Sequence, residues 1–483
     1  MATKQHSRRT FVGGLAAGAV VLGFSPLRRQ WITDVHAEGV VDVETLPPLD
    51  GVLALDDASR DAAAIDFGRF VQERPVAVLK PGSVRDLARV LQFARRHDLR
   101  VAVRGRAHSL YGETLVDHGI VFDLSTLKEI HGVANHVAIV DAGCSWGDVL
   151  DATLPAGLTP PVLPDYPGLS VGGTLSLGGI GPTTFRYGAQ VDNVVSLQVV
   201  TGEGHILWCS RTRKPDLFEA ALAGQGQCAV IARVGLRLVP APATVRVFSL
   251  VYADVATAMS DADRLADDGR FDGVMTFVVP TGGPPLAILV ATAYYTGPQE
   301  PDNATLLDGL RHLPEAAQIA DVTYRQYCDR VQGPFPPLPH PALSLILPGS
   351  SAAIFVERAL ARLTADDLGA FDVIELFHWR RPAFTRPLFR VPEEPRCVGF
   401  TALRYARTPA MEEQMLAGNR ILHDDAVRLG GTVYPFSAVR RSVDDWRRHY
   451  GPQWRALLDA KRRYDPGDRL ASGPDVLGKR ARW

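Results

Sequence analysis

A histidine within a short glycine-containing turn is the first residue whose setting suggests chemistry. Residues 104–109, Arg-Gly-Arg-Ala-His-Ser, directly follow the apolar run 101–103. Such a turn after a strand exposes consecutive backbone N–H groups, which suits a pyrophosphate. Taken alone the pattern is common, and a single histidine is more often a surface or satisfied core residue. The distinguishing feature of His108 is its place beside a candidate phosphate-binding turn, within reach of a cofactor ring.

A second cluster combines a carboxylate with many glycines. Asp165 and Tyr166 precede a stretch, 168–181, that contains six glycines in fourteen residues. Glycines let the backbone approach a ligand without side-chain interference. The stretch lacks the Lys-Ser/Thr of a nucleotide P-loop and the GxGxxG spacing of a dinucleotide fold, so both classes are disfavoured. A glycine-rich structural loop is an equal alternative on these residues alone.

The elements around these clusters predict a mixed fold. A strand at 76–79, an amphipathic helix beginning near Val84 and a strand at 101–103 form a β–α–β unit. A helix over 145–156 is expected to begin with Ser145 as its N-cap and Asp148 three residues later. Further elements are predicted as strands at 120–123, 136–141, 194–200, 246–252 and 287–294, and as helices near 255–268, 301–312 and 411–429.

Composition narrows the class of protein. The 483 residues include 46% hydrophobic and 22% charged residues, which is typical of a globular protein. Lysine and arginine number 52 against 53 acidic residues, so the global basic field of a nucleic-acid binder is missing. Five widely spaced cysteines without a CxxC pair favour buried free thiols and no metal site.

The N-terminus resembles an export signal. Arg8 and Arg9 precede an apolar run over 12–24, which is too short for a permanent membrane span, and 35–37 offers a cleavage site. A disordered basic tail is the plainer alternative. We expect a twin-arginine signal over 1–37, a periplasmic or extracellular location, and no membrane association after signal removal.

A third set of motifs completes a family resemblance. The first two clusters are followed in order by residues 187–194, 199–204, 216–218 and 224–227, and the match continues at 321–324, 339–341, 391–393 and 464–466. Together they resemble the vanillyl-alcohol oxidase (PCMH-type FAD-binding) flavoprotein superfamily, and within it cytokinin dehydrogenase. The likeness implies an α+β fold: a PCMH-type FAD domain of two subdomains with an α+β substrate cap. The expected limits are 38–242 for the FAD domain, 243–435 for the cap and 436–483 for a segment that returns to the FAD domain.

The resemblance assigns roles to particular residues. His108 matches the histidine that bonds covalently to the flavin 8α-methyl group, and Tyr166 stands where bicovalent relatives have a cysteine, so one bond is expected. Asp165 matches the catalytic carboxylate that takes a proton from the substrate; an apolar pocket would make it a better base. The implied FAD site comprises Gly105, Arg106, Ala107, His108, Ser109, Asp165, Tyr166, Ser170, Gly172, Gly173, Thr174, Ser176, Gly179 and Ile231.

Three departures from the family pattern bear on function. Ala107 replaces a glycine in the phosphate turn and is expected to be tolerated. Met275 stands where the family has an adenine-binding glutamate, and Arg380 stands where a small polar amide is expected. If these two residues contact substrate together with Asp165, adenine recognition is weakened and an acidic or oxygen-rich substrate is favoured. The plainer alternative is that Met275 packs in the core and Arg380 is solvated.

The sequence therefore predicts an FAD-dependent oxidoreductase that removes hydride from a C–H next to nitrogen or oxygen. Oxidative cleavage of N6-substituted adenines is the first hypothesis, and an alcohol, amine or sugar oxidase is the alternative within enzymes. Oxygen or a quinone-like molecule is the expected electron acceptor. A non-catalytic flavin carrier is an alternative from another class, and the combination of His108 with Asp165 argues against it. A third alternative, polysaccharide or protein binding without flavin, predicts a colourless protein.

Overall fold

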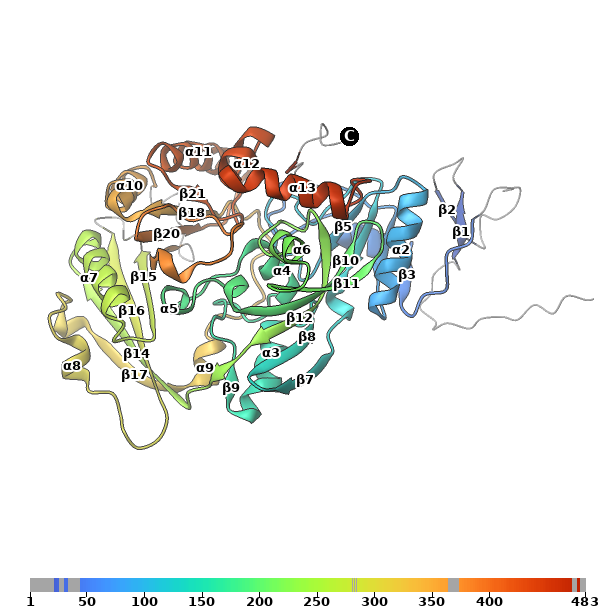
Figure 1. Ribbon diagram of the computed structural model, residues 1–483. Helices are drawn as coiled ribbons and strands as arrows, with labels where there is room; N and C mark the ends of the chain where they lie inside the picture. Colours follow the sequence, from blue (N-terminus) through green and yellow to red (C-terminus); the bar gives the residue numbers. More distant parts are fainter. Residues whose placement is uncertain are drawn as a thin grey trace, which may run out of the picture.

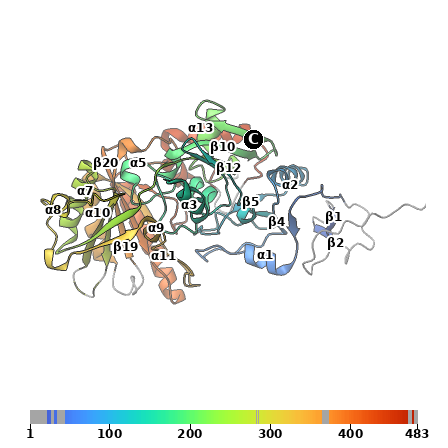
Figure 2. The same cartoon turned by 90° about the horizontal axis from the view of Figure 1, so that it is seen from below.

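The computed structural model describes residues 21–25, 30–33, 44–279, 281, 283, 285–363, 373–470, 476 and 477. The paired arginines and the expected cleavage site lie outside these residues. A hairpin of β1 (Val21–Ser25) and β2 (Gln30–Thr33) overlaps the end of the expected apolar run. Phe24 of this hairpin packs edge-on against Trp31 and Phe93, and the hairpin projects at one end of the molecule (Figures 1 and 2).

The first sheet contains the predicted β–α–β unit. Its order is β3-β4-β6-β5, with β3 antiparallel and the other strands parallel. The strands are β3 (Val52–Ala54), β4 (Ala77–Lys80), β6 (Ile120–Asp123) and β5 (Val101–Arg104). The crossover helix α2 (Val84–Arg96) buries its apolar stripe, including Leu87, Val90 and Leu91, as the helical periodicity predicts.

A second, antiparallel sheet lies beside the first in both views (Figures 1 and 2). Its order is β11 (Ile206–Ser210), β10 (Val194–Thr201), β12 (Ala229–Arg237), β8 (Val137–Asp141) and β7 (Ile130–Ala134). The helix α3 (Trp146–Thr153) begins at Ser145, which forms the predicted capping box with Asp148. A short pair, β9 (Leu158–Thr159) and β13 (Val239–Pro240), joins this region to the next.

The third sheet has eight antiparallel strands, all from residues 244–433, at the opposite end of the molecule from the hairpin (Figure 1). Its order is β17 (Gln318–Thr323), β14 (Thr244–Tyr252), β16 (Leu286–Tyr295), β15 (Gly273–Val279), β19 (Val373–Arg380), β20 (Arg396–Leu403), β18 (Leu343–Pro348) and β21 (Thr432–Val433). One face is covered by α7 (Val255–Asp268), α10 (Gly349–Arg362) and α11 (Pro409–Arg428). The helix expected over 301–312 is shorter, α8 (Asn303–Leu307).

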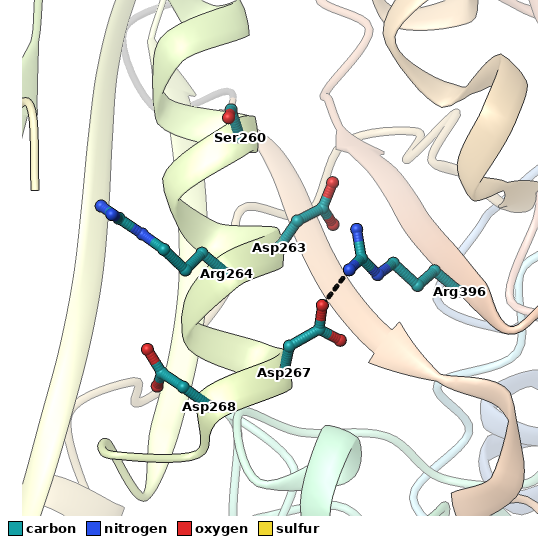
Figure 3. A pocket seen from close by; sticks show the side chains of 6 residues that line it. All are labelled: Ser260, Asp263, Arg264, Asp267, Asp268 and Arg396. Carbon is teal, nitrogen blue, oxygen red and sulfur yellow. Dashed lines mark hydrogen bonds and ion pairs between the residues drawn. The ribbon is translucent and has the colours of Figure 1, made fainter.

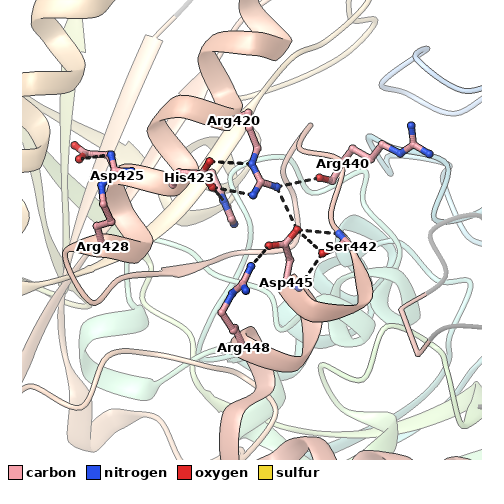
Figure 4. Close-up of polar contacts among 9 residues, drawn as sticks. Arg420, His423, Asp425, Arg428, Arg440, Ser442, Asp445 and Arg448 are labelled. Atoms are coloured by element: carbon pink, nitrogen blue, oxygen red, sulfur yellow. Dashed lines mark hydrogen bonds and ion pairs between the residues drawn. The ribbon is translucent and has the colours of Figure 1, made fainter.

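The chain then returns to the first two sheets. Helices α12 (Val443–Tyr450) and α13 (Trp454–Tyr464) follow β21, and α13 packs on α6 (Pro215–Ala221) while Leu470 bridges to Val101 of β5 (Figure 1). A network of arginine and aspartate side chains ties α11 to α12 (Figure 4). The remaining helices are α1 (Asp57–Ala63), α4 (Val171–Leu177), α5 (Thr184–Tyr187) and α9 (Tyr324–Cys328). All five cysteines are buried free thiols.

Candidate active site

A large cavity lies between the eight-stranded sheet and the two smaller sheets. Its volume is about 780 Å³, within the range of sites for small molecules and cofactors. One side is formed by the two glycine-containing turns, and the other by strands β15, β19, β20 and β18. The cavity thus joins parts of the chain that are hundreds of residues apart in sequence.

The two glycine-containing turns meet at the first side of this cavity. A Cβ atom on Gly105 would lie 1.9 Å from Oγ of Ser170, and one on Gly172 would lie 2.7 Å from the Ala142 Cβ, so both positions require glycine. Ala107 adopts φ +55°, the left-handed region that favours glycine, at a cost of about 1 kcal/mol. In the described part of the chain, the backbone N–H groups of 106–109 donate to no other protein group. These free donors suit an anion, which is what the sequence predicts for this turn.

His108 lies in an aromatic enclosure beside this turn. Its ring stacks on Phe67 with centroids 4.5 Å apart and lies 5.4 Å from the Tyr166 ring and 5.7 Å from that of Phe335. Burial, and then the positive charge of Arg106, lower the pKa of His108 to about 4. The imidazole is therefore neutral at physiological pH, with a nitrogen lone pair available for bonding.

Asp165 lies in the loop between β9 and α4, and the start of α3 holds this loop in place. The backbone N–H of Trp146 donates to the Leu169 carbonyl at 3.0 Å, and that of Gly147 donates to the Pro167 carbonyl at 2.9 Å. Helix N-terminal N–H groups have no partner within their own helix, so the loop satisfies them while they fix its path. The capped N-terminus of α3 thereby positions the carboxylate.

Arg330, which follows α9, is the direct partner of Asp165. Its guanidinium donates to the Asp165 carboxylate and, at 2.9 Å, to the Tyr327 carbonyl, and it lies 4.3 Å from the centre of the Tyr327 ring. Burial acts to lower the pKa of Arg330, but the negative charge of Asp165 and the surrounding tyrosines outweigh it, so this pKa is raised above its usual value. The guanidinium of Arg330 therefore fixes the orientation of the Asp165 carboxylate.

Glu375 is a second carboxyl group on the cavity wall. It lies in a row across four neighbouring strands, in which Phe277 pairs with Glu375, Glu375 with Thr401, and Thr401 with Ser344. All four line the cavity. Burial, and then the negative charge of Asp165, raise the pKa of Glu375 to about 8, against a smaller opposing effect of Arg330. Sequence reasoning singled out neither Glu375 nor Arg330.

The structure brings most of the predicted site residues together. Those that line the cavity are Gly105, Arg106, Ala107, His108, Ser109, Asp165, Tyr166, Ser170, Gly172, Gly173, Thr174, Ser176 and Ile231. Gly179 does not line it; its N–H donates to the hydroxyl of Tyr434, which does. Gly179 therefore contributes indirectly, because its N–H group holds the hydroxyl of the cavity residue Tyr434.

Met275 and Arg380, the expected substrate contacts, lie outside the cavity lining. Side chains alternate between the faces of a strand, and on β19 the cavity face carries residues 373, 375 and 377. Arg380 has the opposite parity and is exposed, and Met275 is 3% exposed in the core next to Phe277. The plainer alternatives for both residues therefore describe where their side chains lie, and contact of either residue with substrate stays a prediction.

Two other polar clusters lack the features of a reactive site. In the shallow pocket between α7 and β20, Arg396 pairs with Asp267 while Arg264 and Asp268 point away (Figure 3). Glu129, His131 and Asp141 could approach a metal ion, but Asp141 already accepts a hydrogen bond from Arg233 at 2.9 Å. Neither cluster borders the aromatic cavity.

The cavity fits an FAD molecule by its chemistry. The free N–H donors of 106–109 suit the pyrophosphate, and the glycine-lined approach at Gly105 and Gly172 leaves room for a ligand at the backbone. The aromatic enclosure of His108 suits a flat ring system.

Comparison with known proteins identifies the family. The FAD binding domain family matches residues 75–210, and the family described as "Cytokinin dehydrogenase 1, FAD and cytokinin binding" matches 281–477. Cytokinin dehydrogenase 4 of Oryza sativa subsp. japonica is 32% identical over 89% of this chain and 91% of its own length. The chain belongs to the cytokinin dehydrogenase family. It is an FAD-binding oxidoreductase of the PCMH-type flavoprotein class with an α+β fold, as the sequence predicts.

Two further comparisons concern a sequence relative and a solved structure with the same fold. An uncharacterized oxidoreductase, ORF5 in the fasciation locus of Rhodococcoides fascians, is 36% identical over 88% of this chain and 99% of its own length. The solved structure of 6-hydroxy-D-nicotine oxidase from Arthrobacter nicotinovorans has a TM-score of 0.70 at 22% identity, covering 88% of this chain and 97% of that one. The second likeness shows a shared fold between the cytokinin dehydrogenase family and this oxidase.

Proposed function

We propose that this protein oxidises a small molecule at a C–H bond next to an amine nitrogen, with Asp165 as the proton acceptor. Oxidative cleavage of an N6-substituted adenine is the first reaction to test. The observation that carries the proposal is the position of Asp165: a carboxylate fixed by α3 and Arg330 in the same cavity as His108. A protein that only stores flavin has no use for such a carboxylate.

Each part of the cavity has a task in this proposal. Bound FAD supplies a hydride acceptor. Asp165 accepts the proton from the substrate N–H, because loss of that proton makes the neighbouring C–H easier to oxidise. Phe67, Phe335 and Tyr166 enclose the reacting region and limit the access of water.

We propose that His108 bonds covalently to the flavin. The neutral imidazole, the stacked Phe67 ring and the adjacent free N–H groups support this assignment. Bonding at this position would orient the ring system toward Asp165. Tyr166 cannot form the second thioether that a cysteine would, so a single bond is proposed.

An alcohol, amine or sugar oxidase acting on a non-adenine substrate is the second candidate. Met275 favours it, because a thioether in the core cannot replace the adenine-binding carboxylate that the family resemblance implies at this position. The same Asp165 would then accept a proton from an O–H or N–H group.

The electron acceptor and the location are parts of the same proposal. Oxygen or a quinone-like molecule would reoxidise the flavin. The paired arginines and the following apolar run support export by the twin-arginine route. Within the described residues, no helix combines the length and the apolar character that crossing a membrane requires.

Anaerobic bleaching of the visible flavin spectrum tests the reaction. The purified protein is mixed with isopentenyladenine, with other secondary amines and with a panel of alcohols and sugars. Bleaching by isopentenyladenine supports the first hypothesis, and bleaching by alcohols or sugars alone supports the second. If no compound bleaches the flavin, the proposed oxidation is contradicted.

A further inference from the structure

Glu375 is a half-buried carboxyl group on the cavity wall, without a hydrogen-bond partner in the described part of the chain. It makes no salt bridge there either, although it lies close enough to Asp165 and Arg330 to feel both charges. Its neighbours in the cross-strand row differ in this respect, because the hydroxyl groups of Ser344 and Thr401 hydrogen-bond to each other at 3.0 Å. Polar groups withdrawn from bulk solvent usually have a partner, and Glu375 faces the cavity, so a ligand in the cavity is the natural partner for this carboxyl group.

The surroundings of Glu375 determine what kind of ligand fits. Phe277 lies beside it in the row and Phe377 two residues further along β19, and both line the cavity. Such surfaces bind a flat ring by stacking and apolar contact. Directly opposite residues on neighbouring strands have Cβ atoms about 5 Å apart. A ligand ring stacked against the side chain of Phe277 would therefore present its edge to the carboxyl group of Glu375.

The protonation state of Glu375 sets the direction of the hydrogen bond. Because burial and the charge of Asp165 raise its pKa to about 8, the group is neutral near pH 7 and carries one O–H donor. Asp165 and Arg330 form an ion pair and already provide the charged groups of the site. The complementary group on the ligand is therefore an uncharged acceptor, such as an unprotonated ring nitrogen.

We infer that Glu375 selects the substrate by donating a hydrogen bond to a ring nitrogen of a flat heterocycle, while Asp165 accepts the proton from the amine attached to that ring. Glu375 would thus perform, from a different strand, the recognition that Met275 cannot. This inference rests on the proposed function. It adds Glu375 as the residue that recognises the ring of the heteroaromatic secondary amine already proposed, and it disfavours a sugar or an aliphatic alcohol.

Calorimetric titration of the holoenzyme with amines that cannot be oxidised tests this inference without turnover. 6-(tert-Butylamino)purine has ring nitrogens, N-tert-butylaniline has none, and neither has a hydrogen on the carbon attached to the amine nitrogen. The purine should bind at least about tenfold more tightly than the aniline, the effect of one good hydrogen bond. Glu375→Leu should remove this preference, and Glu375→Gln, which keeps an N–H donor, should retain most of it.

The pH dependence of the unmodified enzyme provides a second test that needs no variant. Purine binding should weaken above about pH 8, where Glu375 loses its proton, and aniline binding should not. In Glu375→Gln the purine affinity should be independent of pH over this range. Glu357→Gln is the matched control, because Glu357 is an exposed glutamate on α10, on the other face of the same sheet.

Two results would overturn the inference. One is a Glu375→Leu enzyme that still prefers the purine; the other is a parent enzyme that binds the purine no better than the aniline. Flavin bleaching separates these results from a failure of the proposed function. If amines or alcohols still bleach the parent flavin, only the role of Glu375 falls; if nothing bleaches it, the oxidation itself is contradicted.

Discussion

Asp445 and Glu375 are both carboxyl groups largely withdrawn from bulk water, but they differ in their hydrogen-bond partners and in the direction in which their pKa is shifted. Asp445 accepts hydrogen bonds from the Ser442 backbone N–H and hydroxyl at 2.9 Å each and from the guanidinium groups of Arg420 and Arg448 (Figure 4). Burial acts to raise the pKa of Asp445, but the hydrogen bonds from Ser442 and Arg420 outweigh it and lower this pKa below its usual range.

Glu375 has none of these donors, and its pKa is raised. The difference distinguishes two roles of a carboxyl group inside the protein: one stabilises the fold, and the other is available to a ligand. Asp445 joins α11 to α12 and has no capacity left for a ligand. The trio of Asp165, Arg330 and Glu375 borders a cavity, and among the residues that the structure describes the carboxyl group of Glu375 has no protein partner. A carboxylate saturated by protein donors stabilises the fold, whereas an unsaturated one in a cavity is available for binding or proton transfer.

The largest expected effect follows from changing Asp165. Asp165→Asn should retain its flavin, yet anaerobic flavin reduction by substrate should slow more than ~100-fold, because an amide cannot accept the proton. Stopped-flow absorbance measures the rate, and Glu357→Gln serves as the control for loss of a carboxylate. Reduction at the parental rate would remove Asp165 from the mechanism.

A smaller kinetic effect is expected for Arg330, whose role is to position Asp165. Arg330→Met should slow flavin reduction by about tenfold, since a misplacement of ~1 Å can cost about 100-fold in rate. Binding of the non-oxidisable purine should change little, and Arg330→Lys should recover part of the rate. An equal loss of rate and of purine affinity would instead assign Arg330 to substrate binding.

The structural role of Asp445, in contrast to the binding role of Glu375, can be tested by measuring the free energy of unfolding. Asp445→Asn should lower the free energy of unfolding by about 1–3 kcal/mol, because it disrupts a capping box and two charged hydrogen bonds. The folded pKa lies below the unfolded value of about 3.9, so the stabilisation is complete above that pH and is lost as the pH falls through the folded value. Urea titrations at pH 7 and pH 3 should therefore show a larger difference between variant and parent at pH 7. An equal difference at both pH values would contradict this account.

The smallest effect is expected for Arg380. Its side chain is exposed on the strand face opposite the cavity, so Arg380→Ala should change stability by no more than about 0.5 kcal/mol and leave purine affinity unchanged. Parallel urea and calorimetric titrations check both values. A marked loss of purine affinity would show that the parity argument for β19 is wrong.

The sequence predicted the parts of the site that are local in the chain. The turn at 104–109 and the glycine-rich stretch after Asp165 carry backbone signals, and both line the cavity as expected. The capping box of Ser145 with Asp148 was equally readable, because its two residues are three positions apart.

The cap side of the site was not predictable in the same way. Glu375 is the single acidic residue of β19, and Asp165 lies about two hundred positions earlier, so no spacing rule connects them. The only local signal is the acid at an inward position of β19. The expectation for Arg380 rests on the family resemblance alone, and the face of the strand on which this side chain lies follows only from the register of β19. No sequence motif marks Arg330, and its role becomes visible only in the structure, where it follows α9 and lies beside Asp165.

The account depends most on the flavin lying in this cavity, attached to His108. Intact-mass analysis of the purified holoprotein tests this directly, with His108→Ala as the comparison. The parent should be heavier than its polypeptide by one FAD molecule, and the variant should show the polypeptide mass alone and lose its colour on acid precipitation. A parent protein with only the polypeptide mass, or a variant that keeps the added mass, would contradict the assignment of His108.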